Sequence, residues 1–224
     1  QRGRVIVGHT FAAQLGEDWK VERALRVRQS PAQLASAHGD GMDGARQVSL
    51  AADPFVLGVA DFDVLRRFRA ELPHIGAVHE VRIECKSYLP DWRPDRDYRQ
   101  SYSARAEDGG VLRDLIHEID YAVWLFGAPR RVFARLVNGG PLGIEAEEMA
   151  ARSWATPSGA LVSMHLDYLS RIPTRFVRAS GAEGSLSADF LARRVTLRRR
   201  DGSVAHWDEK QSRDEMMQAQ ARAY

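Results

Sequence analysis

The sequence predicts an α+β fold, in which a large and mostly antiparallel β-sheet carries helices on one face. Seven strand-like segments follow one another after Arg130, and short turns with Gly, Pro or Asp-Gly separate most of them. Such turns join adjacent antiparallel strands, and strands in succession need a common sheet. Ahead of these strands, the segment 109–127, GGVLRDLIHEIDYAVWLFG, has the apolar spacing of a helix that covers one sheet face.

The elements expected before that helix lie in two parts of the chain. A short buried-strand pattern occurs at 4–8, and 54–72 has a strand followed by an amphipathic helix. Between them, 12–53 lacks strand signals and contains one helix-like run, 30–37, that begins with Ser-Pro, a favourable N-cap and first helical position. A further strand is expected at 77–88, because its residues partly alternate between apolar and polar.

The predicted helix should run from about Gly110 to Phe126, because Gly127 and Pro129 follow it. A last helix should begin near Ser212, where the sequence SRDE resembles a capping box. The strands between these two helices are expected at 131–137, 145–155, 160–168, 174–180, 185–190, 195–199 and 204–207.

The helix at 110–126 carries the first candidate site. Positions spaced by three or four residues share one helix face, so Asp114, His117, Tyr121 and Trp124 should form one stripe. An imidazole oriented by a carboxylate can exchange a hydroxyl proton near neutral pH. A helical His near a carboxylate is as often a structural, hydrogen-bonded residue, and the helix alone does not decide between these two interpretations.

The segment from Tyr88 to Tyr102 carries the second candidate site. It concentrates aromatic and arginine side chains behind a strand. Guanidinium groups bind carboxylate or phosphate, and aromatic rings offer flat faces to a sugar or base. A solvated loop is the alternative interpretation. The candidate substrate contacts are Lys86, Tyr88, Trp92, Arg93, Arg96, Tyr98, Arg99 and, from the helix, Tyr121.

Composition and charge exclude several classes of partner. The chain has a formal charge of +2, and its arginines are spread along the sequence, so no nucleic acid or acidic partner is implied. The densest arginine cluster, at 193–200, flanks strand residues ahead of an Asp201-Gly202 turn, which indicates a solvated edge strand. No apolar run approaches the length of a membrane span.

Cysteine usage indicates the compartment. Cys85 is the only cysteine, so no intrachain disulfide can form, and no Cys/His set has the spacing of a zinc site. The start of the chain also lacks the pattern of a secretory signal. We therefore expect a cytoplasmic protein without a metal site.

Several motifs together resemble the Gfo/Idh/MocA oxidoreductases, a family named for glucose-fructose oxidoreductase and inositol dehydrogenase. The run 109–127 is similar to the family's GG-apolar-Leu-x-Asp…His-x-x-Asp…Trp-Leu-apolar-Gly helix. The run 164–190, MHLDYLSRIPTRFVRASGAEGSLSADF, resembles its strand, strand, Gly-x-Glu-Gly turn, strand passage. The run that starts YLPDWRPDRDYRQSYSA looks like members that act on sugar nucleotides or related acids. The resemblance covers about 54–224 and implies the family's C-terminal substrate domain.

The resemblance implies a dehydrogenase or reductase that uses NAD or NADP on a sugar, sugar nucleotide or related polyol. Carried onto this sequence, His117 would be the acid/base and Asp114 its orienting partner. Many members place the Asp four residues before the His, whereas here the gap is three. Sheets of this family commonly form subunit contacts, so we expect a homo-oligomer through the open sheet face, with His165 on that face.

The family's nucleotide-binding domain has no convincing counterpart in the sequence. Gly39, Gly41 and Gly44 form the one Gly-x-Gly-x-x-Gly match, but they follow a helix-like run where a strand is required. No Glu-Lys-Pro motif occurs, so the family's catalytic lysine is missing as well. We therefore divide the chain into an uncertain segment, 1–53, regarded as a remnant of the nucleotide-binding domain's edge, and a C-terminal-like domain, 54–224.

Two functions remain open at this point. The chain is either an NAD(P)-dependent oxidoreductase represented by its substrate domain, or a catalytically inactive binding or oligomerisation domain. Both ends look cut, and we expect a fragment that is inactive alone; its cofactor-binding residues are unknown, and binding of NAD or NADP by this chain alone is doubtful. The two functions differ in one observable property, because a dehydrogenase must bind a dinucleotide.

Overall fold

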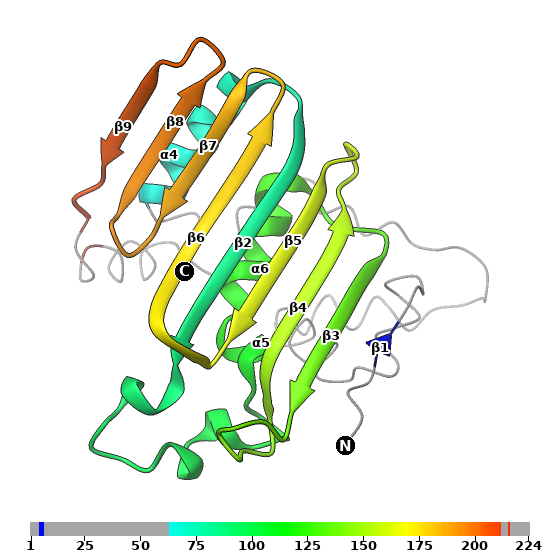
Figure 1. The fold of residues 1–224 in the computed structure, drawn as a ribbon, viewed down its shortest axis with the longest axis vertical. Coiled ribbons are helices and arrows are strands. Elements are labelled where there is room, and N and C mark those ends of the chain that lie inside the picture. Colours follow the sequence, from blue (N-terminus) through cyan, green and yellow to red (C-terminus); the bar gives the residue numbers. More distant parts are fainter. Residues whose placement is uncertain (1–4, 7–62, 212–214, 216–224) are drawn as a thin grey trace, which may run out of the picture.

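A computed structural model describes residues 5–6, 63–211 and 215. These residues form a nine-stranded sheet in the order β1-β3-β4-β5-β2-β6-β7-β8-β9 (Figure 1). In that order the strands are β1 (Val5–Ile6), β3 (Val132–Asn138), β4 (Glu147–Ala155), β5 (Leu161–Asp167), β2 (Val78–Tyr88), β6 (Leu169–Gly181), β7 (Gly184–Asp189), β8 (Arg194–Arg199) and β9 (Val204–Asp208).

The sheet is antiparallel at every pairing except one, which confirms the predicted fold class. Strands β2 and β5 run parallel, with Ile83 opposite Met164, while β2 and β6 are antiparallel. The earliest long strand therefore occupies the centre of the sheet, between strands that come much later in the chain. A parallel pair needs a long crossover connection, and here the connection from β2 to β5 contains the candidate sites and two short helices.

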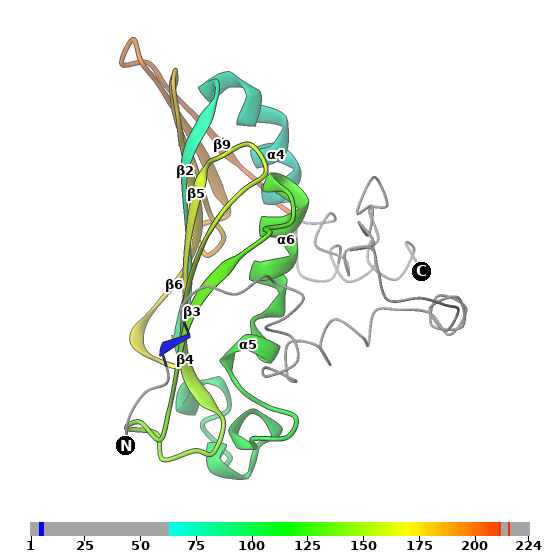
Figure 2. The ribbon, with the colours of Figure 1, turned by 90° about the vertical axis from the view of Figure 1, so that its right-hand side faces the viewer.

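Among the described residues, three α-helices cover one face of the sheet, and no described helix covers the opposite face (Figure 2). They are α4 (Asp63–Glu71), α5 (Val111–Asp114) and α6 (Ile116–Phe126). We call the covered side the helix face and the other side the open face. Along β2 the buried residues Val81 and Ile83 point to the helix face, because side chains alternate along a strand. The core therefore lies between the sheet and these helices.

Every strand predicted after Arg130 is present, with shifts of a few residues at the ends. The helix predicted within 54–72 is α4, which buries Val64, Leu65 and Phe68. The glycine match at 39–44, the run 30–37 and the start of the helix expected near Ser212 lie outside the described residues. Among the described helices, none is long and apolar enough to cross a membrane.

The prediction of one helix over 110–126 was wrong. Leu115 leaves helical geometry, with φ −103° and ψ 28°, so α5 ends at Asp114 and α6 begins at Ile116. Leucine is a good helix former, and no local breaker explains the interruption. The contacts of Asp114 described below are tertiary, and they hold the end of α5 independently of α6.

The segment from β2 to α5 consists of three 3-10 turns, η3 (Leu89–Trp92), η4 (Tyr98–Gln100) and η5 (Tyr102–Ala104). It packs tightly against the start of α5. A side chain on Gly109 would overlap the carbonyl of Tyr102, and one on Gly110 would overlap the carboxylate of Glu147. This close approach requires glycine at both positions and brings η5 next to α5 (Figure 1).

Candidate functional site

The candidate site is centred on the carboxylate of Asp114 at the end of α5. Ser103 Oγ donates a 2.6 Å hydrogen bond to Asp114 Oδ2, and the Tyr168 hydroxyl donates a 2.7 Å hydrogen bond to the same oxygen. Both donors are buried, whereas Asp114 is half-buried. Two hydroxyl donors on one oxygen fix the orientation of the carboxylate before any ligand arrives.

Tyr168, between β5 and β6, is itself held in place by backbone hydrogen bonds. Its backbone N–H donates to Glu148 O at 2.9 Å, and its carbonyl accepts from Leu89 N at 3.0 Å. Burial, followed by the charge of Asp114, raises the pKa of Tyr168 far above its usual range. The phenol therefore stays protonated and acts as a permanent donor. The ring of Trp92 meets the Tyr168 ring edge-on, with centroids 5.4 Å apart.

Tyr102 adds a second phenol on the solvent side of Asp114. It is 46% exposed, and burial, followed by the charge of Asp114, raises its pKa. The nearby guanidinium of Arg93 acts in the opposite direction. Tyr102 and Trp92, which is 39% exposed, are therefore the aromatic surfaces that a ligand can reach beside this carboxylate.

His117 lies in the first turn of α6 and is exposed. The predicted stripe of Asp114, His117, Tyr121 and Trp124 is not formed on one helix, because Asp114 ends α5 and the other three residues belong to α6. Asp114 and His117 remain three positions apart across the break at Leu115. They belong to two separate helices, both of which lie on the helix face of the sheet.

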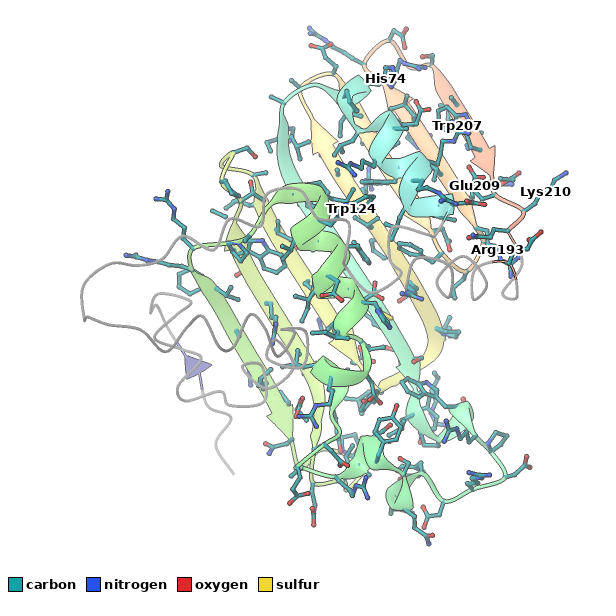
Figure 3. All side chains as sticks on the ribbon, turned by 180° about the vertical axis from the view of Figure 1, so that it is seen from behind. His74, Trp124, Arg193, Trp207, Glu209 and Lys210 are labelled. Atoms are coloured by element: carbon teal, nitrogen blue, oxygen red, sulfur yellow. The ribbon has the colours of Figure 1, made fainter. Side chains whose placement is uncertain are left out.

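The other two members of the predicted stripe point elsewhere. Tyr121 is fully buried, and its ring packs 5.6 Å from the ring of Phe190 in the core. Trp124 lies toward the end of α6 next to α4 (Figure 3), with the guanidinium of Arg69 4.5 Å above its ring. Tyr121 is therefore out of reach of a ligand, and the Trp124 ring is already stacked with Arg69.

Some arginine and aromatic residues of the second predicted site make contacts within the loop, and others are exposed to solvent. Tyr98 and Arg99 hold the segment together, because the Tyr98 hydroxyl donates to Leu142 O at 3.1 Å and the Arg99 guanidinium lies 4.7 Å from the Tyr98 ring. Trp92 Nε1 donates to Ser87 Oγ at 2.9 Å. The Arg93 and Arg96 side chains are exposed near the Asp114 end of the sheet.

Tyr88 has an additional neighbour that the sequence analysis did not single out. Arg171, near the start of β6, stacks with its guanidinium 3.5 Å from the centre of the Tyr88 ring. This stacking is a cation–π contact, which leaves the guanidinium N–H groups available at the ring's edge. The cationic rim of the site therefore comes from two segments far apart in the sequence.

Lys86 lies on the opposite side of the sheet from Asp114 and His117. It alternates with the core residue Cys85 along β2, and its ammonium is 2.6 Å from Glu84 Oε2 on the open face. Arg82 Nη2 lies 2.6 Å from the other oxygen of Glu84. The structure thus does not bring Lys86 together with the other predicted contacts. His165, expected on the less apolar side, does face this open surface, with Nε2 3.3 Å from Asp167 Oδ2.

The start of α5 does not fit the pyrophosphate of a dinucleotide. A pyrophosphate binds where free backbone N–H groups face it at the start of a helix. At the start of α5 the buried carboxylate of Glu147 lies against Gly110, so negative charge already occupies the approach. The residues of this part of the chain also contain no cluster of His, Cys, Asp or Glu that would hold a metal ion.

Sequence reasoning missed Tyr168 and Ser103. Tyr168 continues the apolar alternation of its strand and therefore resembles an ordinary core residue. Ser103 lies in a polar loop where hydroxyls are common. Only the topology, which places β5 beside β2 and folds η5 onto α5, brings both hydroxyls to the same carboxylate.

The described residues form a mostly antiparallel sheet with helices on one face, and Asp114 and His117 belong to helices on that face. The model of a protein family, described as the GFO/IDH/MocA C-terminal domain, matches residues 72–187, more than half of the chain. The chain therefore belongs to the Gfo/Idh/MocA family. A comparison with curated proteins found no match.

Solved structures show the same fold. An oxidoreductase from Agrobacterium radiobacter in complex with NAD+, L-tartaric acid and magnesium aligns with a TM-score of 0.60 at 21% identity, over 75% of this chain and 51% of that one. An inositol dehydrogenase homologue with NAD+ from Azotobacter vinelandii has a TM-score of 0.59 at 12% identity, over 70% and 43%. UDP-N-acetylglucosamine 3-dehydrogenase from Acidithiobacillus ferrooxidans has a TM-score of 0.54 at 18% identity, over 72% and 48%. The chain thus spans about half the length of these proteins.

Proposed function

We propose that residues 63–211 form the substrate-binding half of an NAD(P)-dependent oxidoreductase that acts on a sugar, a sugar nucleotide or a related polyol. The observation that carries this proposal is the carboxylate of Asp114, held by two buried hydroxyls beside exposed aromatic and arginine side chains. His117 follows three positions later on the same side of the sheet. Family membership agrees with this assignment.

In the proposed reaction, His117 accepts the proton of a substrate hydroxyl. Oxidation of an alcohol removes a proton from oxygen and a hydride from carbon, and a neutral imidazole accepts the proton at neutral pH. Asp114 is already oriented, so it can accept a second substrate hydroxyl or stabilise the imidazolium. The hydride acceptor would be NAD or NADP, and residues outside the described part of the chain or outside the chain would have to bind it.

We assign the proposed substrate contacts to side chains that are exposed near Asp114. Trp92 and Tyr102 offer aromatic faces for the apolar face of a sugar ring. Arg93 and Arg96 offer guanidinium groups for a carboxylate or phosphate on the same ligand, and Arg171 extends this rim from the other side. Tyr98 and Arg99 would act indirectly, since they already bind within the loop.

We also propose that the open face forms a contact with a second copy of the chain. Phe133 and Leu161 are large apolar side chains that are 47% and 65% exposed on this face. Phe133 lines a shallow groove of about 580 Å³ whose lining also includes acidic and basic residues of β2. A two-fold contact places the same patch against itself, so neighbouring charges of both signs can pair across it.

The proposed compartment is the cytoplasm, and this proposal rests on the single cysteine. Cys85 is a free, buried thiol of the core and forms no disulfide within the described residues. Oxidising compartments favour disulfides in small secreted domains. A reducing compartment is therefore the better match for this chain.

A thermal melt of the full chain with defined probes tests the proposed function. The probes are myo-inositol, L-tartrate and UDP-N-acetylglucosamine, each with and without millimolar NAD+ or NADP+. Binding to the folded state must raise the melting temperature. We expect at least one probe to raise it, Trp92→Ala to abolish that rise, and His206→Gln, on the exposed strand β9, to leave it unchanged.

The second arm of the experiment separates the two candidate functions. Turnover of the binding probe with NAD+ or NADP+, lost in His117→Gln but kept in His206→Gln, would establish an oxidoreductase. A probe that binds while neither dinucleotide raises the melting temperature would favour a catalytically inactive binding domain. Turnover that survives His117→Gln would refute the acid/base role.

A further inference from the structure

The direction of His117 is not set by the contacts that hold Asp114. Ser103 and Tyr168 tether the end of α5, but Leu115 interrupts the helix before His117. A continuous helix would transmit the orientation of one residue to the next turn, at 3.6 residues per turn. Leu115 interrupts this regular geometry, so the contacts of α6 with the sheet also bear on how α6 is rotated about its axis.

Two acidic residues of α6, Glu118 and Asp120, are buried, and Glu118 forms an ion pair with the sheet. Glu118 is 1% exposed and points into the sheet together with Tyr121 and Ala122. Its Oε1 accepts hydrogen bonds from Arg175 on β6, at 2.9 Å from Nε and 2.7 Å from Nη2. The Arg175 guanidinium also lies 5.1 Å from the ring of Phe190. The carboxylate of Glu118 thus ties α6 to strand β6.

Two other groups of the core lie within the field of this pair. The thiol of Cys85, on β2, has its pKa raised to about 12 by burial and then by the charge of Glu118. Burial and then Glu118 also raise the pKa of Tyr121 well above its usual value. The pair therefore occupies the space between α6, β2 and β6, where both strands meet the helix.

An ion pair of this kind constrains rotation more strongly than apolar contacts do. Apolar side chains pack without directional preference, whereas a guanidinium binds a carboxylate with defined geometry. Breaking the pair would leave an uncompensated buried charge, which is a severe penalty. Because His117 is adjacent to Glu118, fixing Glu118 against the sheet leaves His117 about 100° around the axis, on the exposed side.

We propose that Glu118 and Arg175 are positioning residues, whose buried ion pair fixes the rotation of α6 and thereby the direction in which His117 faces. The functional meaning of this proposal rests on the proposed role of His117. The structural part of the proposal does not rest on that role, because the ion pair would hold α6 whether or not the imidazole transfers a proton.

The test follows His117 by NMR in the full chain. The imidazole Cε1–H signal of His117 is assigned by its loss in His117→Gln, and its position is then compared between the wild type and variants. We expect Arg175→Met to shift and broaden this signal. Arg194→Met is the matched control, because Arg194 on β8 makes an ion pair with Asp208 on β9, and both side chains are exposed. The control should leave the His117 signal unchanged.

A double variant keeps the test decisive if Arg175→Met does not fold. Glu118→Met with Arg175→Met removes both charges and keeps the side-chain volumes, a replacement that proteins often tolerate. Cys85 reports on packing, since its buried thiol should react slowly with a disulfide reagent as long as α6 remains on the sheet. We expect a folded double variant with a protected thiol and a displaced His117 signal.

Two results would overturn the positioning role. One is a wild-type His117 signal in a folded Arg175→Met or double variant. The other is an equal displacement in Arg194→Met, which would show a general effect of charge. Failure of the proposed reaction would look different, because His117→Gln would then leave turnover unchanged while the NMR result stood.

Discussion

Tyr168 donates a 2.7 Å hydrogen bond to Asp114, although 54 positions separate the two residues. One lies where β5 passes into β6, and the other ends a helix of a single turn. The same carboxylate oxygen accepts from Ser103. This contact explains how a four-residue helix, too short to be stable by itself, keeps its end in place beside the candidate site.

Removal of the Tyr168 hydroxyl should cost more stability than removal of an ordinary phenol hydrogen bond. A hydrogen bond to a charged acceptor contributes about 1.5–3 kcal/mol, against about 1 kcal/mol for a neutral one. We expect Tyr168→Phe to lower the free energy of unfolding by more than Tyr98→Phe, whose hydroxyl donates to the Leu142 carbonyl. Urea denaturation measures both. Equal losses in the free energy of unfolding would mean that the hydrogen bond to Asp114 is no stronger than one to a neutral acceptor.

The glycine at the start of α5 should be far less tolerant than a glycine in an open turn. Gly110 has φ +102°, and a side chain there would overlap Glu147, whereas Gly202 has φ +85° with open space around it. Both changes to Ala strain the backbone by about 1 kcal/mol or more. Gly110→Ala should lose about 2 kcal/mol beyond Gly202→Ala, because a core carboxylate must also move. Urea midpoints of the two variants, with the slopes compared, check this.

The fold was accessible from the sequence because its signals are local. Turn residues and alternation placed the strands after Arg130 within a few residues, and apolar spacing found α4. The central position of β2 was not accessible. It depends on a parallel pairing with β5 across a long connection, and neither strand carries a signal for that partner.

The site was accessible only in part. Asp114 and the exposed arginines could be named from residue type, but the two hydroxyls that hold Asp114 arrive from distant segments. The break at Leu115 has no sequence signal either, since leucine favours helices. Periodicity alone therefore placed Tyr121 beside His117, whereas the packing of α6 turns Tyr121 into the core.

Charge on the open face should weaken the proposed contact between two copies. Leu161 is an exposed leucine on that face, and a glutamate there would have to be buried unpaired. We expect Leu161→Glu to raise the dissociation constant of the oligomer by at least about tenfold, measured by sedimentation equilibrium. Ile172→Glu is the matched control, because Ile172 is 80% exposed in the turn region that begins β6. A similar effect of both variants, or a monomeric wild type, would contradict the proposed contact.

Alkaline pH should destabilise the chain, and Cys85 should account for a defined share of the effect. Its thiol has a pKa of about 12 in the folded protein, against 9.0 as its ordinary value, because of burial and the charge of Glu118. Above pH 9.0 the unfolded chain therefore binds fewer protons than the folded one. The free energy of unfolding should consequently fall as pH rises, by up to about 1.4 kcal/mol per pH unit for this one group.

Below the ordinary pKa both states keep the proton, so this part of the stability is fully present at neutral pH. Tyr102 and Tyr168 also have raised pKa values and add to the loss at higher pH. The thiol's share is isolated by urea titrations of the wild type and Cys85→Ala at several pH values. The variant should be less stable at neutral pH, because it leaves a small cavity, but its stability should decline less steeply above pH 9.0. Parallel pH profiles would show that the thiol ionises in the folded core as readily as in the unfolded chain.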